Sequence, residues 1–292
     1  MSSATPWIEI PSPFDSHGGQ VLMLEPPWAN EGELRAQLLD ETYSKPFVID
    51  DGERRYLHFD GRLIQSAMSL AAPNDLELRY TQKMMSFLLF RSRPRRLLLI
   101  GLGGGSLVKF CHCRLPATQL TVLENNPDVI ALREAFLVPP DSPMLQVLEA
   151  DGAEYLARTE KGIDALLVDA FDRNGFAPSL ANREFFEQAH AKLAGGGILV
   201  VNLAGDEKTY AGLIGEAMQV FDDQVIVFPV REDDNHVLLA FRDPMFEPNW
   251  RRLRAFAREL RAKYGLDFPN FLEKIERSAR LGLARREAER GY

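Results

Sequence analysis

The chain has 292 residues, of which 46% are hydrophobic and 26% are charged, and its formal net charge at pH 7 is −8. This composition is typical of a globular protein, and with no apolar run long enough to cross a bilayer it excludes a membrane-spanning or wholly disordered chain. The N-terminus carries no export signal, so we expect a cytoplasmic protein with no membrane partner. Because nucleic-acid binding requires a basic surface, the acidic balance also argues against a nucleic-acid partner.

The N-terminal part of the sequence is expected to contain two units. Residues 1–40 hold several prolines and little periodicity, which predicts an extended arm. Residues 41–80 hold short apolar runs separated by Asp-Gly turns, at Asp51-Gly52 and Asp60-Gly61, and this pattern predicts consecutive β-hairpins. A small N-terminal β module is therefore expected ahead of the main domain.

Residues 81–246 are expected to form the main domain. It begins with a buried helix predicted over 80–90, and beyond Arg96 strand and helix patterns alternate. Five short runs rich in Leu, Val and Ile are separated by stretches that accommodate helices: Leu97–Ile100, Gln119–Leu123, Leu145–Leu148, Ile163–Val168 and Ile198–Asn202. This pattern predicts an α/β domain with a doubly wound, Rossmann-like parallel sheet. Two further runs, Gln224–Phe228 and Val237–Phe241, leave no room for a helix between them and predict an antiparallel hairpin at the sheet edge.

The last segment, residues 247–292, differs from the rest in charge. It contains twelve basic and seven acidic residues, a net charge of +5, which leaves −13 for the preceding part of the chain. Apolar residues at helical spacing from Trp250 to Tyr264 predict an amphipathic helix, followed by a break at Gly265 and a second helix through Ile275. We expect these basic C-terminal helices to pack on the body or on a subunit partner.

A glycine-rich turn follows the first of the five parallel strands. Gly101, Gly103 and Gly105 come directly after Leu97–Ile100 and before a predicted helix, where glycines allow the backbone to approach a nucleotide closely. Glu124 ends the next strand, in a position where a carboxylate accepts hydrogen bonds from both ribose hydroxyls. The pair indicates an adenosine-containing ligand.

Two later strands also end in carboxylates. Asp151 follows Leu145–Leu148, and Asp169 follows Ile163–Val168, with Asp172 three residues further on. Because ligands of open α/β sheets bind outside the carboxyl ends of the strands, Glu124, Asp151 and Asp169 are expected to face one cleft. So many acids favour a cationic adenosine ligand, such as a sulfonium, over a dinucleotide.

The sequence from about Tyr43 to Phe241 resembles the spermidine synthases, the polyamine aminopropyltransferases. The resemblance lies in the glycine turn, in Glu124, in Asp151-Gly152-Ala153, and above all in Val168-Asp169-Ala170-Phe171-Asp172 followed by Glu184-Phe185-Phe186. It implies a sheet of the S-adenosylmethionine-dependent methyltransferase type. It also implies a homodimer that transfers the aminopropyl group of decarboxylated S-adenosylmethionine to a small cationic amine, with release of methylthioadenosine.

The resemblance also implies a role for individual residues. The cofactor is expected to contact Gly101, Gly103, Gly105, Glu124, Asp151 and Gly152, with Glu124 at the ribose and Asp151 at the adenine. The amine is expected to contact Gln65, Tyr80 and Asp172. Asp169 is the expected catalytic base, because an alkylamine with a pKa near ~10 must lose a proton before it attacks, at a free-energy cost of ~4 kcal/mol at neutral pH.

The sequence departs from the family pattern at several positions. Gly104 stands where the family has an aspartate beside the aminopropyl arm of the cofactor, Thr81 stands where the family has His or Gln, and Arg173 replaces a proline. Without the aspartate, selection against ordinary S-adenosylmethionine is weaker. Two alternatives therefore stay open: an S-adenosylmethionine-dependent methyltransferase, and a non-catalytic homologue that binds an adenosine ligand.

The two cysteines, Cys111 and Cys113, flank His112. Residues two apart on a helix point to different faces, and no second Cys/His pair follows at zinc spacing, so we expect no metal site.

Overall fold

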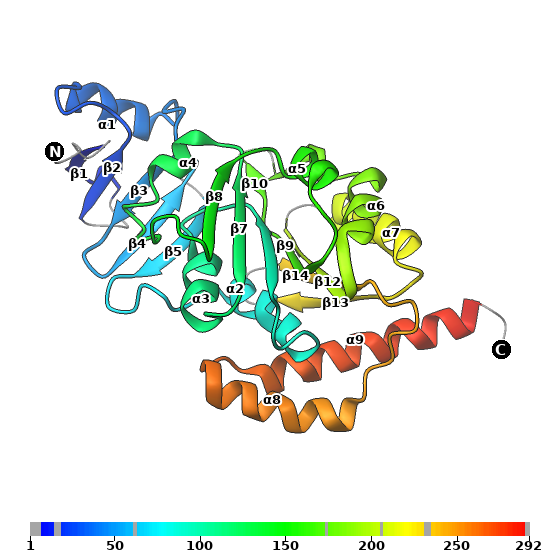
Figure 1. Ribbon diagram of the computed structural model, residues 1–292. Coiled ribbons are helices and arrows are strands. Elements are labelled where there is room, and N and C mark those ends of the chain that lie inside the picture. The colour runs from blue at the N-terminus through cyan, green and yellow to red at the C-terminus, as the bar shows by residue number, and fades with distance from the viewer. Residues whose placement is uncertain are drawn as a thin grey trace.

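The computed structural model describes residues 7–14, 19–60, 63–172, 175–204, 207–230 and 235–289. Two sheets lie side by side, with a pair of long helices beneath the larger one (Figure 1). None of the helices in these ranges combines the length and the apolar character that a membrane span requires.

The N-terminal sheet is an antiparallel meander of five strands in the order β1-β2-β3-β4-β5. Its elements are β1 (Ile8–Pro11), β2 (Gln20–Met23), β3 (Phe47–Asp50), β4 (Arg54–His58) and β5 (Ile64–Ser69), with helix α1 (Glu31–Leu39) between β2 and β3. The hairpin predicted at Asp51-Gly52 is present: Asp50 and Asp51 accept hydrogen bonds from the backbone N–H groups of the tight turn that joins β3 to β4. β4 also pairs antiparallel with β5, whereas Gly61 of the second predicted turn lies outside the described residues.

The prediction of an extended arm over residues 1–40 is wrong. This part of the chain contributes β1, β2 and α1, and β2 pairs with β3 of the expected module. The strands are only four residues long and Pro11 ends the first of them, so too few residues alternate to produce a periodic signal. Burial of Ile10, Val21 and Met23 in a core shared with α1 holds the segment in the sheet.

The central sheet has seven strands in the order β13-β14-β12-β9-β6-β7-β8. Its strands are β6 (Arg96–Ile100), β7 (Gln119–Glu124), β8 (Leu145–Glu149), β9 (Ile163–Val168), β12 (Leu193–Leu203), β13 (Val225–Val230) and β14 (Asn235–Phe241). The first five run parallel, whereas β14 is antiparallel to both β12 and β13. Both the parallel doubly wound sheet and its antiparallel edge hairpin are thereby confirmed.

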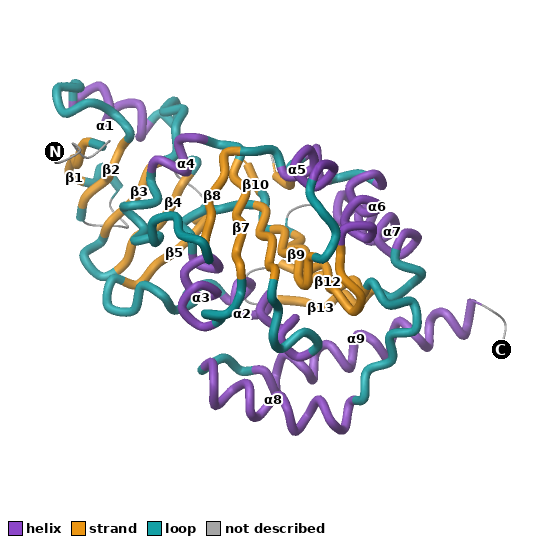
Figure 2. Tube along the Cα trace, in the orientation of Figure 1, coloured by secondary structure: helices purple, strands orange, loops and turns teal. Residues whose placement is uncertain are grey.

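Helices cover both faces of this sheet (Figure 2). Alternate residues of β6 enter different cores: Leu97 and Leu99 pack on one side, Leu98 and Ile100 on the other. The remaining elements are α2 (Arg79–Met84), the 3₁₀ helix η1 (Met85–Leu89), α3 (Ser106–Arg114), α4 (Pro127–Ala131), α5 (Gly152–Arg158), the short hairpin β10 (Phe171–Asp172) and β11 (Gly175–Phe176), η2 (Pro178–Leu180), α6 (Arg183–Lys192) and α7 (Glu207–Val220).

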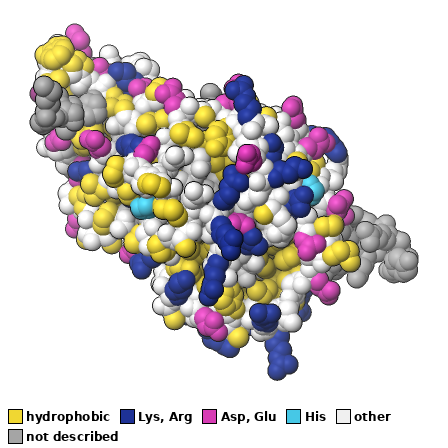
Figure 3. Space-filling model, in the orientation of Figure 1, with side chains coloured by type: hydrophobic (Ala, Val, Ile, Leu, Met, Phe, Trp, Pro, Cys, Tyr) yellow, Lys and Arg dark blue, Asp and Glu magenta, His cyan; other side chains and the backbone are white. Residues whose placement is uncertain are grey.

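The C-terminal helices form an antiparallel hairpin, α8 (Trp250–Tyr264) and α9 (Phe268–Glu289), joined at Gly265 in the left-handed conformation. The predicted break is confirmed, but the second helix runs to Glu289, well past Ile275, through a more polar sequence in which Glu276 is the last buried residue described and Leu281 is exposed. The hairpin packs on η1 and β13, and basic side chains project along the lower edge of the molecule, where α8 lies (Figure 3).

Candidate active site

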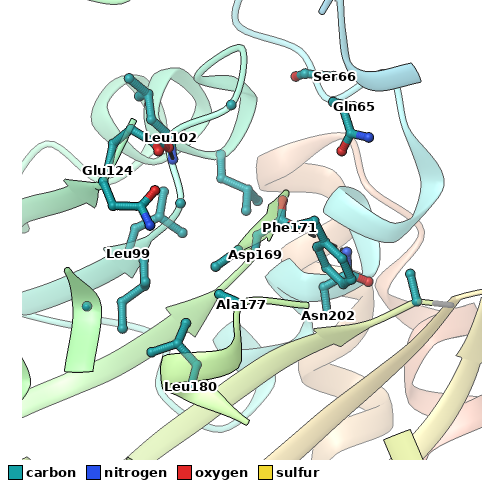
Figure 4. Close-up of a pocket in the computed structure, with 18 of the residues that line it drawn as sticks. Gln65, Ser66, Leu99, Leu102, Glu124, Asp169, Phe171, Ala177, Leu180 and Asn202 are labelled. Carbon is teal, nitrogen blue, oxygen red and sulfur yellow. Dashed lines mark hydrogen bonds between the residues drawn. The ribbon is translucent and has the colours of Figure 1, made fainter. Parts of the chain in front are cut away.

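A pocket of about 510 Å³ opens at the carboxyl ends of the parallel strands. One wall is the ends of β6, β7, β8 and β9, and the opposite wall includes Phe59, Asp60 and residues 63–66, which lead into β5 of the N-terminal sheet. Gln65 and Ser66 lie across the pocket from Glu124, with Asp169 between the two walls (Figure 4). The two sheets therefore build the pocket jointly.

The glycine turn has the backbone geometry that only glycine adopts freely. Gly101, Gly103 and Gly105 all have positive φ angles, of 98°, 51° and 67°. A Cβ atom at Gly101 would lie 2.0 Å from the carbonyl oxygen of Asp169, so the turn and the end of β9 touch directly. Gly101 and Gly103 line the pocket, whereas Gly105 begins α3 and packs against Val138.

Glu124 is held by the backbone through both of its carboxylate oxygens. Oε2 accepts a hydrogen bond of 2.9 Å from the N–H of Leu102, in the glycine turn, and Oε1 accepts one of 2.9 Å from the N–H of Asn126. A carboxylate has about four acceptor positions, so each oxygen keeps a further one for a ligand. The arrangement suits two neighbouring hydroxyl groups.

Asp151 has a structural task in addition to its place in the pocket. It is the N-cap of α5: Oδ1 accepts hydrogen bonds from the N–H groups of Ala153 and Glu154, while Oδ2 accepts one of 2.9 Å from the hydroxyl of Ser179. Gly152 lines the pocket beside it, and a Cβ atom there would lie 2.5 Å from the side chain of Ile100. Contact of Asp151 with a cofactor stays a prediction.

Asp169 lies at the floor of the pocket between two hydrogen-bond donors. The amide of Asn202 donates to Oδ1 at 2.9 Å, and the hydroxyl of Tyr80 donates to Oδ2 at 3.2 Å. Burial raises the pKa of Asp169 from 3.8 to about 6, although both hydrogen bonds oppose the change because they favour the charged form. The carboxylate is thereby a stronger base than an exposed aspartate.

The residues expected to contact the amine are only partly described. Tyr80, in the first turn of α2, and Gln65, in β5, both line the pocket, as does Thr81, whose hydroxyl is used within its own helix by donating to the carbonyl of Leu78. The side chain of Asp172 and the whole of Arg173 lie outside the described residues. Their roles stay predictions.

Gly104, which takes the place of the family aspartate, is a packing position in this fold. A Cβ atom on Gly104 would lie 2.7 Å from the hydroxyl oxygen of Ser66 and 2.9 Å from the ring of Phe136. Both contacts are closer than van der Waals separation, so the space for a side chain is already filled. The N-terminal sheet packs on the glycine turn here, and Ser66 rather than residue 104 borders the pocket.

Several polar residues of the pocket were not predicted from the sequence, among them Asn202, Asn235 and Ser179. Asn202 and Asn235 come from β12 and β14, and Ser179 comes from η2. Asn202 lies near the carboxyl end of the apolar strand β12, and the rule that identified Asp169 at the end of β9 applies equally to it. Asn235 and Ser179 carry no such signal. Asn235 reaches the pocket because β14 pairs with β12, and Ser179 reaches it from the short 3₁₀ helix η2.

The described residues that line the pocket give it a strongly negative charge. Four carboxylates line it, those of Asp60, Glu124, Asp151 and Asp169, and none of the described residues that line it is Lys, Arg or His. Low-dielectric walls concentrate the field of such a group, so the pocket attracts cations and repels anions. The described part of the chain contains no cluster of side chains suited to a metal ion.

Comparison with known proteins agrees with this geometry. Residues 77–210 match the model of the spermine/spermidine synthase domain. A polyamine aminopropyltransferase from Chromobacterium violaceum is 35% identical over 232 residues, which cover 79% of this chain and 89% of that protein.

Two solved structures share the fold. A probable spermidine synthase from Corynebacterium glutamicum superposes with a TM-score of 0.62 at 22% identity, over 74% of this chain and 84% of that one. A spermidine synthase in complex with the transition-state analogue AdoDATO superposes with a TM-score of 0.53 at 15% identity, over 89% of this chain and 95% of that one. The fold is that of the Rossmann-like methyltransferase type, and by its sequence the chain belongs to the spermine/spermidine synthase family.

Proposed function

We propose that the protein is a polyamine aminopropyltransferase that transfers the aminopropyl group of decarboxylated S-adenosylmethionine to a small amine and releases methylthioadenosine. The observation that carries the proposal is the set of four carboxylates in one pocket, three of them at the strand ends where a nucleoside binds in this fold. Both substrates of such a reaction are cations. The relatives named polyamine aminopropyltransferase support the same activity.

The residues present fit the nucleoside part of the co-substrate. Glu124 offers one free acceptor position on each carboxylate oxygen to the two ribose hydroxyls. Gly101 and Gly103 bring the backbone to the surface of the pocket without a side chain. Asp151 and Gly152, on the next strand end, are proposed to contact the adenine. The volume of about 510 Å³ lies within the range of ordinary ligand sites.

The chemistry follows from the position and basicity of Asp169. The co-substrate supplies a carbon activated by a sulfonium and a neutral thioether as leaving group. Asp169 removes a proton from the attacking amine, and the rise of its pKa from 3.8 to about 6 makes that transfer easier by about 3 kcal/mol. Because this pKa is still below neutral pH, the carboxylate is mostly ionised when the amine arrives.

The wall formed by the N-terminal sheet is proposed to bind the amine. Figure 4 shows Gln65 on this wall, and Tyr80 is hydrogen-bonded to Asp169. Both side chains offer polar atoms to an amine whose nitrogen approaches Oδ2 of Asp169, and Asp172 is proposed to bind the same substrate. A cytoplasmic homodimer belongs to the proposal too, and gel filtration with light scattering tests the dimer.

Product analysis by mass spectrometry tests the function. The purified protein is incubated with decarboxylated S-adenosylmethionine or S-adenosylmethionine, and with amines from putrescine to spermine. We expect methylthioadenosine, formed only with the decarboxylated compound and an amine, together with the lengthened amine. Formation of S-adenosylhomocysteine would instead establish methyl transfer. The matched control is Asp169→Asn, which should bind methylthioadenosine like the wild type but give no product.

A further inference from the structure

Three neighbouring strands of the central sheet align polar side chains behind Asp169. β12 lies between β9 and β14. Val201 of β12 pairs with Val168 of β9, so the next residues, Asn202 and Asp169, stand side by side. On the other side Asn202 pairs with Val237 of β14, and Asn235 lies two residues away on the same face of that strand.

These side chains form a continuous chain of hydrogen bonds. Asn235 Nδ2 donates to Asn202 Oδ1 at 2.9 Å, and Asn202 Nδ2 donates to Asp169 Oδ1 at 2.9 Å. On the pocket side, the Tyr80 hydroxyl donates to Asp169 Oδ2 at 3.2 Å. Asn202 is 2% exposed and Asn235 is 8% exposed, so the two amides are buried behind the carboxylate.

The direction of the chain follows from the charge at its end. An ionised carboxylate only accepts hydrogen bonds, so Asn202 must turn its NH₂ group toward Asp169 and its carbonyl oxygen toward Asn235. Asn235 stabilises this orientation because it supplies the donor that the buried carbonyl needs. Without that donor, the oxygen would be left unsatisfied, and rotation of the amide would direct it at the carboxylate.

We propose that Asn202 and Asn235 are positioning residues that fix Oδ1 of Asp169 as an acceptor within the sheet and leave Oδ2, beside Tyr80, as the oxygen that receives the proton of the amine. This inference rests on the proposed function. It assigns separate tasks to the two oxygens of one carboxylate, and it gives Asn235, which does not touch Asp169, an influence on the reaction.

The proposed reaction transfers one proton to Asp169 and one aminopropyl group to the amine. An N–H bond of the ammonium breaks, and its proton moves to Oδ2. The electron pair left on nitrogen forms the new N–C bond to the aminopropyl carbon. The C–S bond breaks, and its electron pair stays on sulfur, which becomes the neutral thioether of the leaving nucleoside. Asp169 ends the step protonated on the oxygen that faces the pocket.

The effect of Asn235 on the protonation of Asp169 must be separated from the effects of other titratable groups. Tyr80 of α2 contacts Asp169 directly, and the carboxylates of Asp60, Glu124 and Asp151 line the same pocket. Lys83 and His236 are carried by α2 and β14, which pack against β12, but neither lines the pocket. None of these groups is altered when Asn235 is replaced.

The first test does not depend on turnover. The unfolding equilibrium of the full chain is measured in urea at pH 8 for the wild type, Asp169→Asn, Asn235→Leu and the double variant. Loss of the Asn235 donor should make the charged form of Asp169 less favourable. Asp169→Asn should therefore lower the unfolding equilibrium constant in both backgrounds. The factor by which it does so should be about ten times larger in the Asn235→Leu chain than in the wild type. Asn235→Ala repeats the cycle if the leucine variant does not fold.

The control is Leu239→Ala, on the same strand and the same face as Asn235. Leu239 is buried in the hydrophobic core and pairs with Val200 and Ile226, so its truncation weakens β14 without removing either amide. In the Leu239→Ala chain, Asp169→Asn should change the unfolding equilibrium constant by the same factor as in the wild type. The cycle therefore separates a specific influence of Asn235 from general destabilisation of the strand.

The second test uses putrescine and decarboxylated S-adenosylmethionine between pH 5 and 8. For Asn235→Leu we expect the acid limb of kcat/KM to move up by about one pH unit, with a lower kcat and an unchanged KM for the sulfonium compound. Equal effects of Asp169→Asn in the wild type and in Asn235→Leu would overturn the proposal. The proposal would also be overturned if the stability effects of Asp169→Asn and Asn235→Leu are coupled but Asn235→Leu leaves both kcat and the acid limb of kcat/KM unchanged. A wild-type protein without turnover contradicts only the proposed function, because the stability cycle still reports whether Asn235 acts on Asp169.

Discussion

Asp169→Asn should abolish turnover and at the same time make the folded protein more stable at neutral pH. The pKa of Asp169 is raised from 3.8 to about 6 by burial in the folded protein. Between these two values the folded state binds more protons than the unfolded state, so the ionised carboxylate opposes folding. This opposition is absent below pH 4, grows as the pH rises, and is complete above pH 6.

The magnitude follows from the same two pKa values. A difference of about two units corresponds to about 3 kcal/mol at pH 8, and to about half of that at pH 5. Asparagine has the same shape and no charge, and its carbonyl still accepts the hydrogen bond from Asn202. The variant should therefore gain up to about 3 kcal/mol in free energy of unfolding at pH 8, as an upper bound for the burial of this charge.

Urea denaturation followed by circular dichroism at pH 8 and pH 5 measures the effect. The matched control is Asp164→Asn, on the same strand. Burial acts to raise the pKa of Asp164, but hydrogen bonds from the N–H groups of Arg95 and Arg96 and from Arg91 outweigh it, so the pKa is lowered overall. Its charge favours folding, and the control should lose stability, by about 3 kcal/mol. An Asp169→Asn variant no more stable than the wild type at pH 8 would refute the reasoning.

Three further outcomes are expected. The value of kcat/KM for the amine should fall about tenfold for each pH unit below about 6, where Asp169 becomes protonated, and a rate independent of pH from 5 to 8 would contradict its role as base. Gly104→Ala should lower the free energy of unfolding by about 1–3 kcal/mol, because its Cβ atom lies 2.7 Å from Ser66 Oγ. Ser66→Gly in the same chain should restore part of the loss, and additive effects in thermal denaturation would show that the contact is unimportant. Glu124→Gln should raise the Kd for methylthioadenosine about tenfold in calorimetry, since an amide offers its ligand only one acceptor oxygen, whereas an unchanged Kd would remove Glu124 from the ribose site.

The parallel sheet and its edge hairpin were predictable from the sequence, because buried parallel strands are continuous apolar runs bounded by turns. The carboxylates at the strand ends were also predictable. An acidic residue that directly follows a parallel strand lies at the carboxyl edge of the sheet, where ligands bind. Glu124 and Asp169 both line the pocket as this rule requires. The assignment of roles to single residues depended on the family resemblance.

Other features depend on contacts between distant segments and leave no local pattern. β1 and β2 are short and are stabilised by strand pairing, β1 with β2 and β2 with β3, so their sequence alone is indistinguishable from that of a loop. Gly104 has an evident meaning only when Ser66, almost forty residues earlier, is known to pack against it. Asn235 lies at the start of an edge-hairpin strand, and its place behind Asp169 follows from strand register rather than from its neighbours in sequence.

The four carboxylates of the pocket have a consequence for the release of the two products. In the proposed reaction the nucleoside enters as a sulfonium cation and leaves as a neutral thioether, so it loses its attraction to Asp60, Glu124, Asp151 and Asp169 on turnover. The amine instead gains a nitrogen and a positive charge. The same field therefore no longer attracts the nucleoside product but still attracts the lengthened amine, so release of the amine is the step expected to become faster as salt is added.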